Sequence, residues 1–267
     1  MTASAYKGPI DIANRARICL NMIVRQESAR IERCLASVAP HIACYAIMDT
    51  GSTDGTQAMV RDYMGARGIA SHLWEGPFTN FRDTRNAALV GARRLRDDLA
   101  WDYLLLCDAD MELVAPDWLG ELSAPGYQML QRTSALEYWN ARITRWDNEC
   151  RYVCPTHEYL DTKFPFEKLC GPWFRDFADG ANRPGKIERD LTLLAAEVER
   201  DPNDARSWFY LANSYRELGR HAEAVEAYER RVALGGWDEE VYAALLYASR
   251  SAREMERHES LTPAPYS

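Results

Sequence analysis

Two carboxylates follow an uninterrupted apolar run, Tyr103 to Cys107, and a single alanine separates them: Asp108-Ala109-Asp110. Such a run is typical of a strand buried on both faces of a sheet. Alternate residues at a strand end point the same way, so the two carboxylates can converge on one point. Hard oxygen ligands suit Mn²⁺ or Mg²⁺, which can in turn hold a diphosphate. The alternative is a polar turn after a strand, where Asp is common.

A second polar group follows the apolar run Ile42 to Met48 and begins with Asp49. The next residues, TGSTDGT, combine a glycine turn with Ser52, Thr53 and Asp54, each able to cap a helix. Glycine lets backbone approach a ligand, and the free amides at a helix start favour negative oxygens. This stretch therefore predicts a second binding element.

The order of apolar runs predicts a scaffold that brings these residues together. Expected strands at 18–24, 42–48, 68–73 and 103–107 alternate with expected helices at 28–40, 54–66 and 78–98. This alternation is typical of an open parallel sheet with helices on both faces, and sites in such sheets lie at the carboxyl ends of the strands. Further strands are expected at 127–133 and 136–145. Residues 152–160 would then return His157 and Glu158 to the sheet edge.

From Lys186 onward the chain is rich in Ala, Glu, Arg and Leu, which favour helix. Trp208 and Tyr242, Leu211 and Leu245, and Ala212 and Leu246 are each 34 residues apart, the period of tetratricopeptide repeats. Only one and a half to two repeats fit, whereas about three are normally needed for independent stability. We therefore expect these helices to pack on the preceding domain or to form a homodimer with a second copy.

Composition limits the classes of partner and compartment. The chain of 267 residues has a formal net charge of −8, which disfavours general binding to nucleic acid or to an anionic membrane. Met1 to Arg17 lack the apolar core of a signal peptide, and no run reaches the roughly 18 to 20 apolar residues that span a bilayer. We expect a soluble, cytoplasmic protein. Its seven cysteines mostly lie in apolar runs and favour reduced core thiols over disulfides.

Six segments, in order, resemble family 2 glycosyltransferases with the GT-A fold, in the subgroup that carries tetratricopeptide repeats. They are ICLNMIVRQE, MDTGSTDGT, FTNFRDTRNAAL, CDAD, RYVCPTHEYL and KIERDLTLL, within residues 17–250. The resemblance implies an α/β fold, a Rossmann-like and mostly parallel sheet with helices on both faces, followed by an all-α tetratricopeptide-like segment. The expected domains are a nucleotide-sugar-binding domain at 1–185 with a mobile lid at 170–185, helices at 186–252, and a flexible tail at 253–267.

The resemblance implies metal-dependent transfer of a sugar from a nucleotide diphosphate donor, expected to be a UDP-sugar, with inversion at the anomeric carbon. A cation, Mn²⁺ or Mg²⁺, would stabilise the charge that develops on the departing diphosphate. Asp110 is the first expected metal ligand, and Asp108 would be shared between metal and ribose. His157 would add a third contact, since imidazole is an acceptable ligand for Mn²⁺; the alternative is a structural histidine.

The resemblance also implies the residues that bind the nucleotide sugar. Those expected at the base, ribose and phosphates are Val24, Glu27, Asp49, Arg85, Asp108, Lys186 and Arg189. Asp49 would accept from a uracil or ribose donor group. The alternative for Arg85 is a salt bridge that fixes its helix, and Lys186 and Arg189, like Arg183 in the expected lid, could be solvated charges or helix-start salt bridges.

Inversion by direct displacement needs a base for the acceptor proton, and a carboxylate is the usual choice. Glu158 is the candidate, with support of an arginine as its alternative role. The catalytic residues expected are therefore Glu158 and Asp110. The acceptor stays open between a saccharide, a peptide and a modified nucleobase.

Two other interpretations compete with this one. Cys150, Cys154, His157 and Cys170 could form a zinc site, although their spacing is irregular. The chain could also be a non-catalytic tetratricopeptide scaffold with a vestigial nucleotide-binding domain. A vestigial domain predicts lost carboxylates, yet Asp49, Asp108 and Asp110 are all present.

Overall fold

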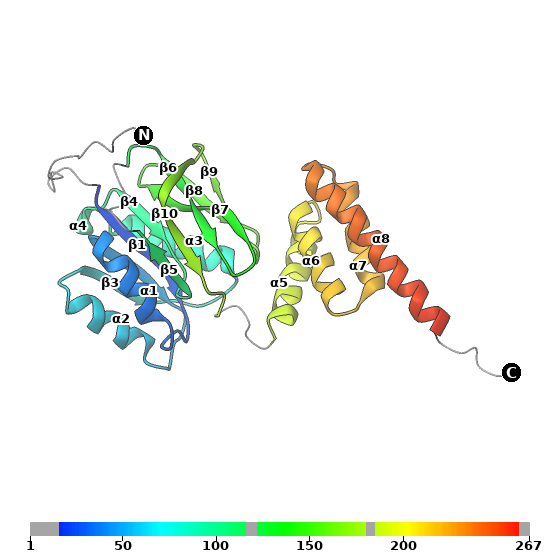
Figure 1. Cartoon of the computed structure of the whole chain (residues 1–267), viewed down its shortest axis with the longest axis horizontal. Coiled ribbons are helices and arrows are strands. Elements are labelled where there is room, and N and C mark those ends of the chain that lie inside the picture. The colour runs from blue at the N-terminus through cyan, green and yellow to red at the C-terminus, as the bar shows by residue number, and fades with distance from the viewer. Residues whose placement is uncertain (1–15, 116–121, 180–184, 262–267) are drawn as a thin grey trace, which may run out of the picture. The chain divides into compact units, whose positions relative to one another are not determined.

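The computed structural model describes residues 16–115, 122–179 and 185–261. By its internal contacts the chain divides into two compact units, which we treat separately (Figure 1). The first unit comprises Met1–Phe78, Thr84–Arg151 and Leu160–Gly180, and the second comprises Thr79–Asp83, Tyr152–Tyr159 and Ala181–Ser267. Within the described residues, no helix is both long and apolar enough to cross a membrane.

The first half of the sheet is parallel, with strand order β3-β2-β1-β4. Its strands are β1 (Ile18–Val24), β2 (Cys44–Asp49), β3 (Ala70–Glu75) and β4 (Tyr103–Leu106). All residues of β2 and β4 are buried, as the apolar runs predicted. The carboxyl ends of β1, β2 and β4 therefore lie at one edge of the sheet.

Helices cover both faces of these strands, because alternate residues of each strand point to opposite sides. Helices α1 (Ile31–Val38) and α2 (Thr56–Gly65) pack in one core with Leu20 and Met22 of β1. On the opposite face, Asn21 donates to the carbonyl of Ala88 in helix α3 (Phe81–Arg94). Figure 1 shows α1 and α2 in front of the strands and α3 behind them. A one-turn 3₁₀ helix, η2 (Ala39–His41), and the short α4 (Arg96–Leu99) complete this part.

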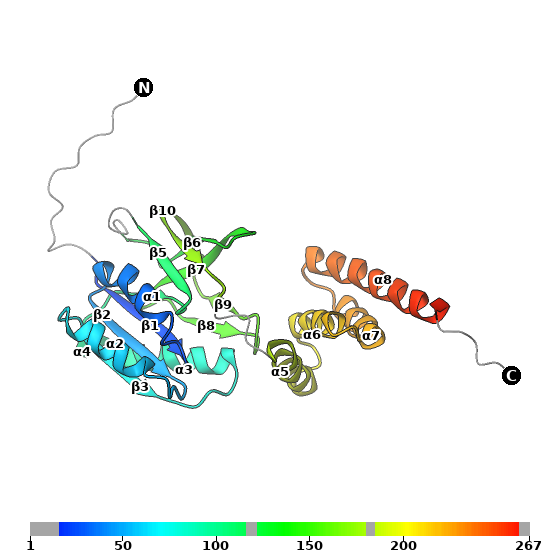
Figure 2. The same cartoon turned by 60° about the horizontal axis from the view of Figure 1, so that its bottom comes forward.

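The second half of the sheet is mixed in direction (Figure 2). Strand β7 (Glu137–Arg145) runs antiparallel to both β4 and β6 (Gly126–Arg132). Strand β10 (Glu167–Asp176) is parallel to β6 and antiparallel to β5 (Met111–Val114) at the edge. A separate two-stranded sheet joins β8 (Cys150–Val153) and β9 (Tyr159–Thr162). The predicted α/β class is confirmed, with antiparallel strands added beyond β4.

The first part of the expected lid, residues 170–176, is a strand of the main sheet. Phe174 is fully buried, and Trp173 and Phe174 pair with both β6 and β5. The Gly and Pro that suggested a loop lie in an irregular part of this strand. Its register with β6 shifts between Leu169 and Trp173, where Gly171 has φ +115°. Residues 180–184, including Arg183, lie outside the described part of the chain.

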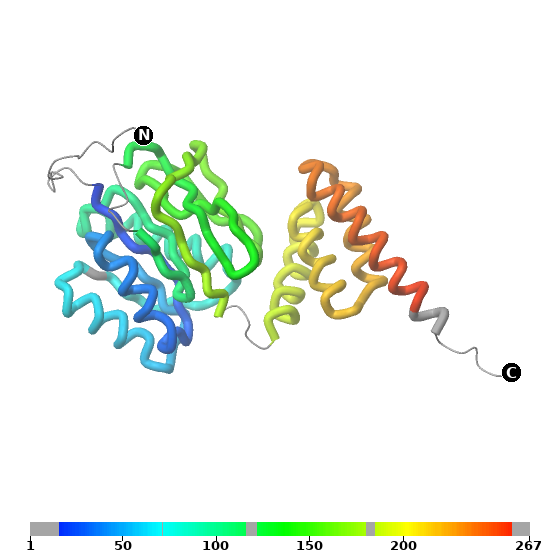
Figure 3. Tube along the Cα trace, viewed as in Figure 1, coloured from blue at the N-terminus to red at the C-terminus, as the bar shows by residue number. Residues whose placement is uncertain are grey.

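In residues 185–261, four helices of the second unit pack in chain order, α5 on α6, α6 on α7 and α7 on α8 (Figure 3). They are α5 (Lys186–Arg200), α6 (Ala205–Glu217), α7 (His221–Ala233) and α8 (Asp238–Leu261). Ala212, Ala224, Ala227 and Ala244 let the helices approach closely, and the buried Tyr228 fills the space between them. Helix α8 extends past residue 252, where a tail was expected, because Ala252, Glu254 and Met255 favour helix.

Candidate functional site

Asp108, directly beyond β4, is held by two arginines from different elements. Its Oδ1 accepts from Nη2 of Arg85 on α3 at 2.5 Å, and its Oδ2 accepts from Nη1 of Arg142 on β7 at 3.3 Å. Burial raises the pKa of Asp108, but the two guanidiniums outweigh burial and lower it to about 2. Asp108 is therefore ionised at neutral pH. Arg85, for which a salt bridge was the alternative role, forms one with this carboxylate.

Arg142 belongs to a buried polar network that sequence reasoning missed. Its Nη2 donates to Oε1 of Gln131 at 2.6 Å, and its Nη1 donates also to the carbonyl of Leu106 at 3.3 Å. Gln131 in turn donates to Asp176 at 2.8 Å and accepts from Asn140 at 3.3 Å. Strands β6, β7 and β10 thereby fix the guanidinium beside the end of β4. The available signal was a charged residue between Ala141 and Ile143 in the expected strand 136–145.

The Nε of Arg142 is buried and has no hydrogen-bond partner. The Nε atoms of Arg33 and Arg96 are likewise buried without a partner, so this feature matters at Arg142 through its place in the network around Asp108. The guanidinium lies 5.7 Å from the ring of Phe174, and the Arg142 side chain is 8% exposed. Arg142 thus carries spare donor capacity next to Asp108.

Asp49 forms the second element of the site, at the end of β2. Its Oδ1 accepts from the backbone N–H groups of Gly51 at 2.9 Å and Ser52 at 2.7 Å, across a turn in which Gly51 has φ +101°. Its Oδ2 is buried and has no partner. The parallel register places Val24 beside Asp49, so both expected nucleoside contacts lie together. An unsatisfied buried carboxylate oxygen fits a ligand that donates a hydrogen bond.

Glu27 lies in the loop after β1, which is tied to the loop after β2. The backbone N–H of Glu27 donates to Oγ1 of Thr56 at 2.8 Å, and that of Gln26 donates to Oγ of Ser52 at 2.9 Å. The carboxylate of Glu27 forms an ion pair with Arg30 at 2.9 Å. The structure therefore places Val24, Glu27 and Asp49 in one connected edge of the sheet.

Asp110 is half-buried, and its carbonyl accepts from the backbone N–H of Phe177 at 3.2 Å. Tyr138 of β7 lies within electrostatic range of three carboxylates, those of Asp176, Asp108 and Asp110. Burial raises the pKa of Tyr138, Arg142 lowers it, and the three carboxylates raise it further. The Tyr138 hydroxyl therefore stays protonated near these acids, and its side chain is 40% exposed.

The remaining expected site residues belong to the second unit. The ring of His157 stacks on Tyr210, with centroids 4.1 Å apart and planes 7° apart. Burial lowers the pKa of His157, against a smaller raising effect of Asp190, so the neutral form dominates at pH 7. Arg189 forms an ion pair with Asp190 at 3.0 Å. Convergence of His157 with the aspartates of the first unit stays a prediction, as do the roles of Glu158 and Lys186.

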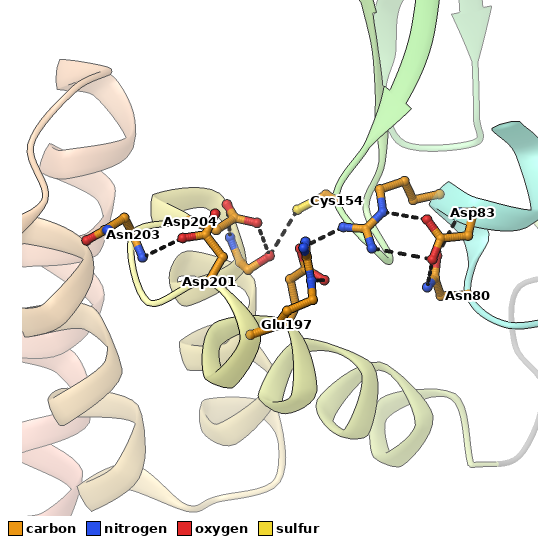
Figure 4. Close-up of polar contacts among 10 residues, drawn as sticks. Asn80, Asp83, Cys154, Glu197, Asp201, Asn203 and Asp204 are labelled. Atoms are coloured by element: carbon orange, nitrogen blue, oxygen red, sulfur yellow. Dashed lines mark hydrogen bonds and ion pairs between the residues drawn. The ribbon is translucent and has the colours of Figure 1, made fainter.

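Cys154, one of the four residues of the alternative zinc site, makes other polar contacts in the second unit (Figure 4). Its Sγ lies 3.3 Å from Oγ of Ser207, which donates to Asp204 at 2.7 Å. In the same unit, Arg82 forms ion pairs with Asp83 at 2.8 Å and with Glu197 at 2.6 Å. No group of three or more potential ligands from His, Cys, Asp and Glu occurs within residues 16–115, 122–179 and 185–261. The described residues thus provide no preformed zinc site.

The carboxylates of Asp108 and Asp110 fit a cation site that is completed by a substrate phosphate. Mg²⁺, and Mn²⁺ with similar ligands, is commonly held by one or two carboxylates together with substrate phosphates and water. Two carboxylates, one of them engaged by arginines, match that arrangement and do not match a cage made wholly of protein ligands. The residues therefore fit a cation that binds together with a diphosphate.

Comparison with known proteins agrees with the predicted resemblance. Residues 19–125 match the model of glycosyl transferase family 2. Residues 205–248 match a tetratricopeptide repeat model. The predicted resemblance to family 2 glycosyltransferases and to tetratricopeptide repeats is thus confirmed over these two segments. The matched region includes Val24, Glu27, Asp49, Arg85, Asp108 and Asp110.

Individual relatives are more distant. A TPR repeat-containing protein of Synechococcus elongatus is 31% identical over 159 residues, which cover 56% of this chain and 36% of the relative, so the chain spans about a third of that protein. The crystal structure of S. aureus TarS 1-349 is 14% identical, with TM-score 0.43 over 94% of this chain and 93% of that one. GlyE of Streptococcus pneumoniae TIGR4 is 17% identical, with TM-score 0.30 over 49% and 33%.

Proposed function

We propose that the protein transfers a sugar from a nucleotide diphosphate donor, a UDP-sugar, to an acceptor that is a saccharide, a peptide or a modified nucleobase. The observation that supports this most strongly is the edge formed by the ends of β1, β2 and β4, within the family 2 region. There, Asp49 at the end of β2 presents a buried, unsatisfied oxygen, and Asp108 and Asp110 follow β4, on the other side of β1.

In this proposal each part of the edge binds one part of the donor. Oδ2 of Asp49 accepts from a uracil N–H or a ribose hydroxyl, with Val24 and Glu27 beside the nucleoside. Arg85 and Arg142 donate to diphosphate oxygens, since guanidinium forks suit phosphate. Asp110 and Asp108 hold Mn²⁺ or Mg²⁺, which when bound stabilises the charge on the departing diphosphate.

The acceptor half of the reaction is proposed on the resemblance. Glu158 takes the proton of the acceptor nucleophile, which attacks the anomeric carbon as the bond to the diphosphate breaks, and the product has inverted configuration. Lys186 and Arg189 bind phosphate oxygens, and His157 adds a contact to the cation. The ion pair of Arg189 with Asp190 and the stacking of His157 on Tyr210 are the competing structural roles.

A screen of nucleotide sugars tests the donor proposal. Release of nucleoside diphosphate is measured with and without MnCl₂, for the wild type, Asp110→Ala and Asp97→Asn. Asp97 is 94% exposed and serves as the control for loss of a carboxylate. The proposal predicts Mn²⁺-dependent release from one donor, lost in Asp110→Ala and kept in Asp97→Asn. Neither turnover nor binding with any donor would contradict it and favour the non-catalytic scaffold.

We also propose that α8 pairs with α8 of a second copy. Tyr242, Leu245 and Leu246 are 69%, 53% and 37% exposed on one side of the helix. In an antiparallel pair, Asp238 and Glu239 at the acidic start of α8 would face Arg250 and Arg253 of the other copy. Such a pair would bury the apolar side chains and match opposite charges.

Light scattering after size exclusion tests this pairing on the full chain. The wild type should have the mass of a dimer and Leu245→Glu that of a monomer. Leu136→Glu, at a site 66% exposed in the first unit, is the matched control and should remain dimeric. A wild type that is monomeric at every concentration would contradict the pairing.

A further inference from the structure

Two arginines offset the charges of Asp108 and Asp110 before any ligand binds, while a third carboxylate, Asp176, accepts from Gln131 in the same polar network. Two carboxylates, Asp108 and Asp110, accompany two guanidiniums, Arg85 and Arg142, and both guanidiniums bind Asp108. Arg142 is nearly fully buried, and Asp108 is three-quarters buried, so these charges interact more strongly than at an exposed surface. The local net charge of these four side chains is zero.

A neutral set of this kind discriminates between ligands that bind singly and ligands that bind as a pair. A divalent cation alone would add two positive charges beside two guanidiniums and would have to displace an arginine from Asp108. A diphosphate diester alone would add two negative charges beside two carboxylates. The two ligands together add no net charge, and the diphosphate oxygens supply the acceptors that the guanidiniums lose from Asp108.

The anchoring of Arg142 makes this exchange feasible. Gln131, fixed by Asp176 and Asn140, holds Nη2 of Arg142, so the guanidinium stays in place when Asp108 turns away. Its orphaned Nε is a further donor without a protein acceptor. A buried arginine with an unused donor and a replaceable carboxylate partner is suited to receive an incoming anion.

We propose that Arg142 and Arg85 act as an internal counter-ion gate: they occupy Asp108 in the free protein, so a divalent cation binds tightly only together with the nucleotide diphosphate. This inference rests on the proposed function and adds the order and coupling of ligand binding. Arg142 is here a positioning residue for Asp108, and it becomes a phosphate ligand when the diphosphate enters.

Binding of Mn²⁺ to the full chain, without nucleotide, tests the gate directly. Free Mn²⁺ is measured by electron paramagnetic resonance during titration of the wild type, Arg142→Gln and Arg142→Lys. Removal of a buried positive charge next to Asp108 should tighten Mn²⁺ binding by about tenfold or more in Arg142→Gln. Arg142→Lys keeps the charge and should stay within about threefold of the wild type.

The coupling between the two ligands gives a second readout. Titration calorimetry measures UDP binding in EDTA and at saturating MnCl₂, and the ratio of the two dissociation constants gives the coupling. The wild type should show at least about tenfold tighter UDP binding with Mn²⁺. Arg142→Gln should show a smaller ratio, because in that variant the cation no longer depends on the diphosphate to free Asp108.

The gate is overturned if folded Arg142→Gln and the wild type bind Mn²⁺ alone with equal affinity. If circular dichroism shows that Arg142→Gln is unfolded, Arg85→Gln applies the same test from α3, where the side chain is 15% exposed. Failure of the proposed function has a different signature: UDP would bind under neither condition. The Mn²⁺ titration without nucleotide would then still decide whether the arginines block the cation.

Discussion

Replacement of Asp108 by asparagine should lower stability, and part of that loss should depend on pH. The arginines lower the pKa of Asp108 from 3.8 to about 2. A shift of nearly two units corresponds to roughly 2 kcal/mol, at 1.36 kcal/mol per unit. Because the folded-state pKa lies below the unfolded-state value, this contribution is fully present above about pH 4 and is lost as the pH falls through 2.

Asp108→Asn should therefore be less stable than the wild type by about 2–4 kcal/mol at pH 7, the larger figure including the buried donors of Arg142 left without a carboxylate. Urea unfolding is followed by fluorescence at several pH values between 7 and 2.5. At each pH it gives the difference in free energy of unfolding between Asp108→Asn and the wild type. The difference should shrink towards the acid end. The control Asp97→Asn, at a 94% exposed site, should stay within about 0.5 kcal/mol of the wild type. A difference that is small at pH 7, or that does not change with pH, would refute the assigned ion pairs.

Two further substitutions test the second unit and the nucleoside end of the site. Arg231 and Glu240 form a buried ion pair in which Nε and Oε1 are 2.6 Å apart. Arg231→Met should destabilise the helices by about 3 kcal/mol, because buried Glu240 then keeps only the longer contact to Arg206 at 3.8 Å. Thermal melts by circular dichroism measure this, and Arg220→Met, at a partly exposed pair, should have little effect. Asp49→Asn places an amide donor against the donor group of the nucleoside and should weaken UDP binding by about 10- to 100-fold in calorimetry; unchanged affinity would exclude Asp49 from the site.

The parallel half of the fold was predictable because its strands are buried on both faces. Continuous apolar runs marked β1, β2 and β4, and the polar residues that end them, Asp49 and Asp108, were found by position alone. Six of the seven cysteines are buried and all are free, as the apolar runs indicated. The 34-residue period placed the helical hairpins of the second unit.

In the second half of the sheet, the strands predicted at 127–133 and 136–145 match β6 and β7, whereas β5 and β10 were not predicted. Strand β10 contains glycine and proline in a register shift, so the sequence resembled a loop. Arg142, Gln131 and Asp176 come from three different strands, with Asp176 45 residues from Gln131, and only the sheet pairing shows that they form one network. The partner of a buried charge depends on long-range pairing, which spacing within one segment does not specify.

A crystal structure of the full chain with UDP and MnCl₂ tests the central claim most directly. The site described here predicts the nucleoside against Oδ2 of Asp49, the diphosphate on Arg85 and Arg142, and Mn²⁺ on Asp110 with Asp108 released from at least one guanidinium. UDP bound elsewhere, or a diphosphate that leaves both arginines on Asp108, would contradict it.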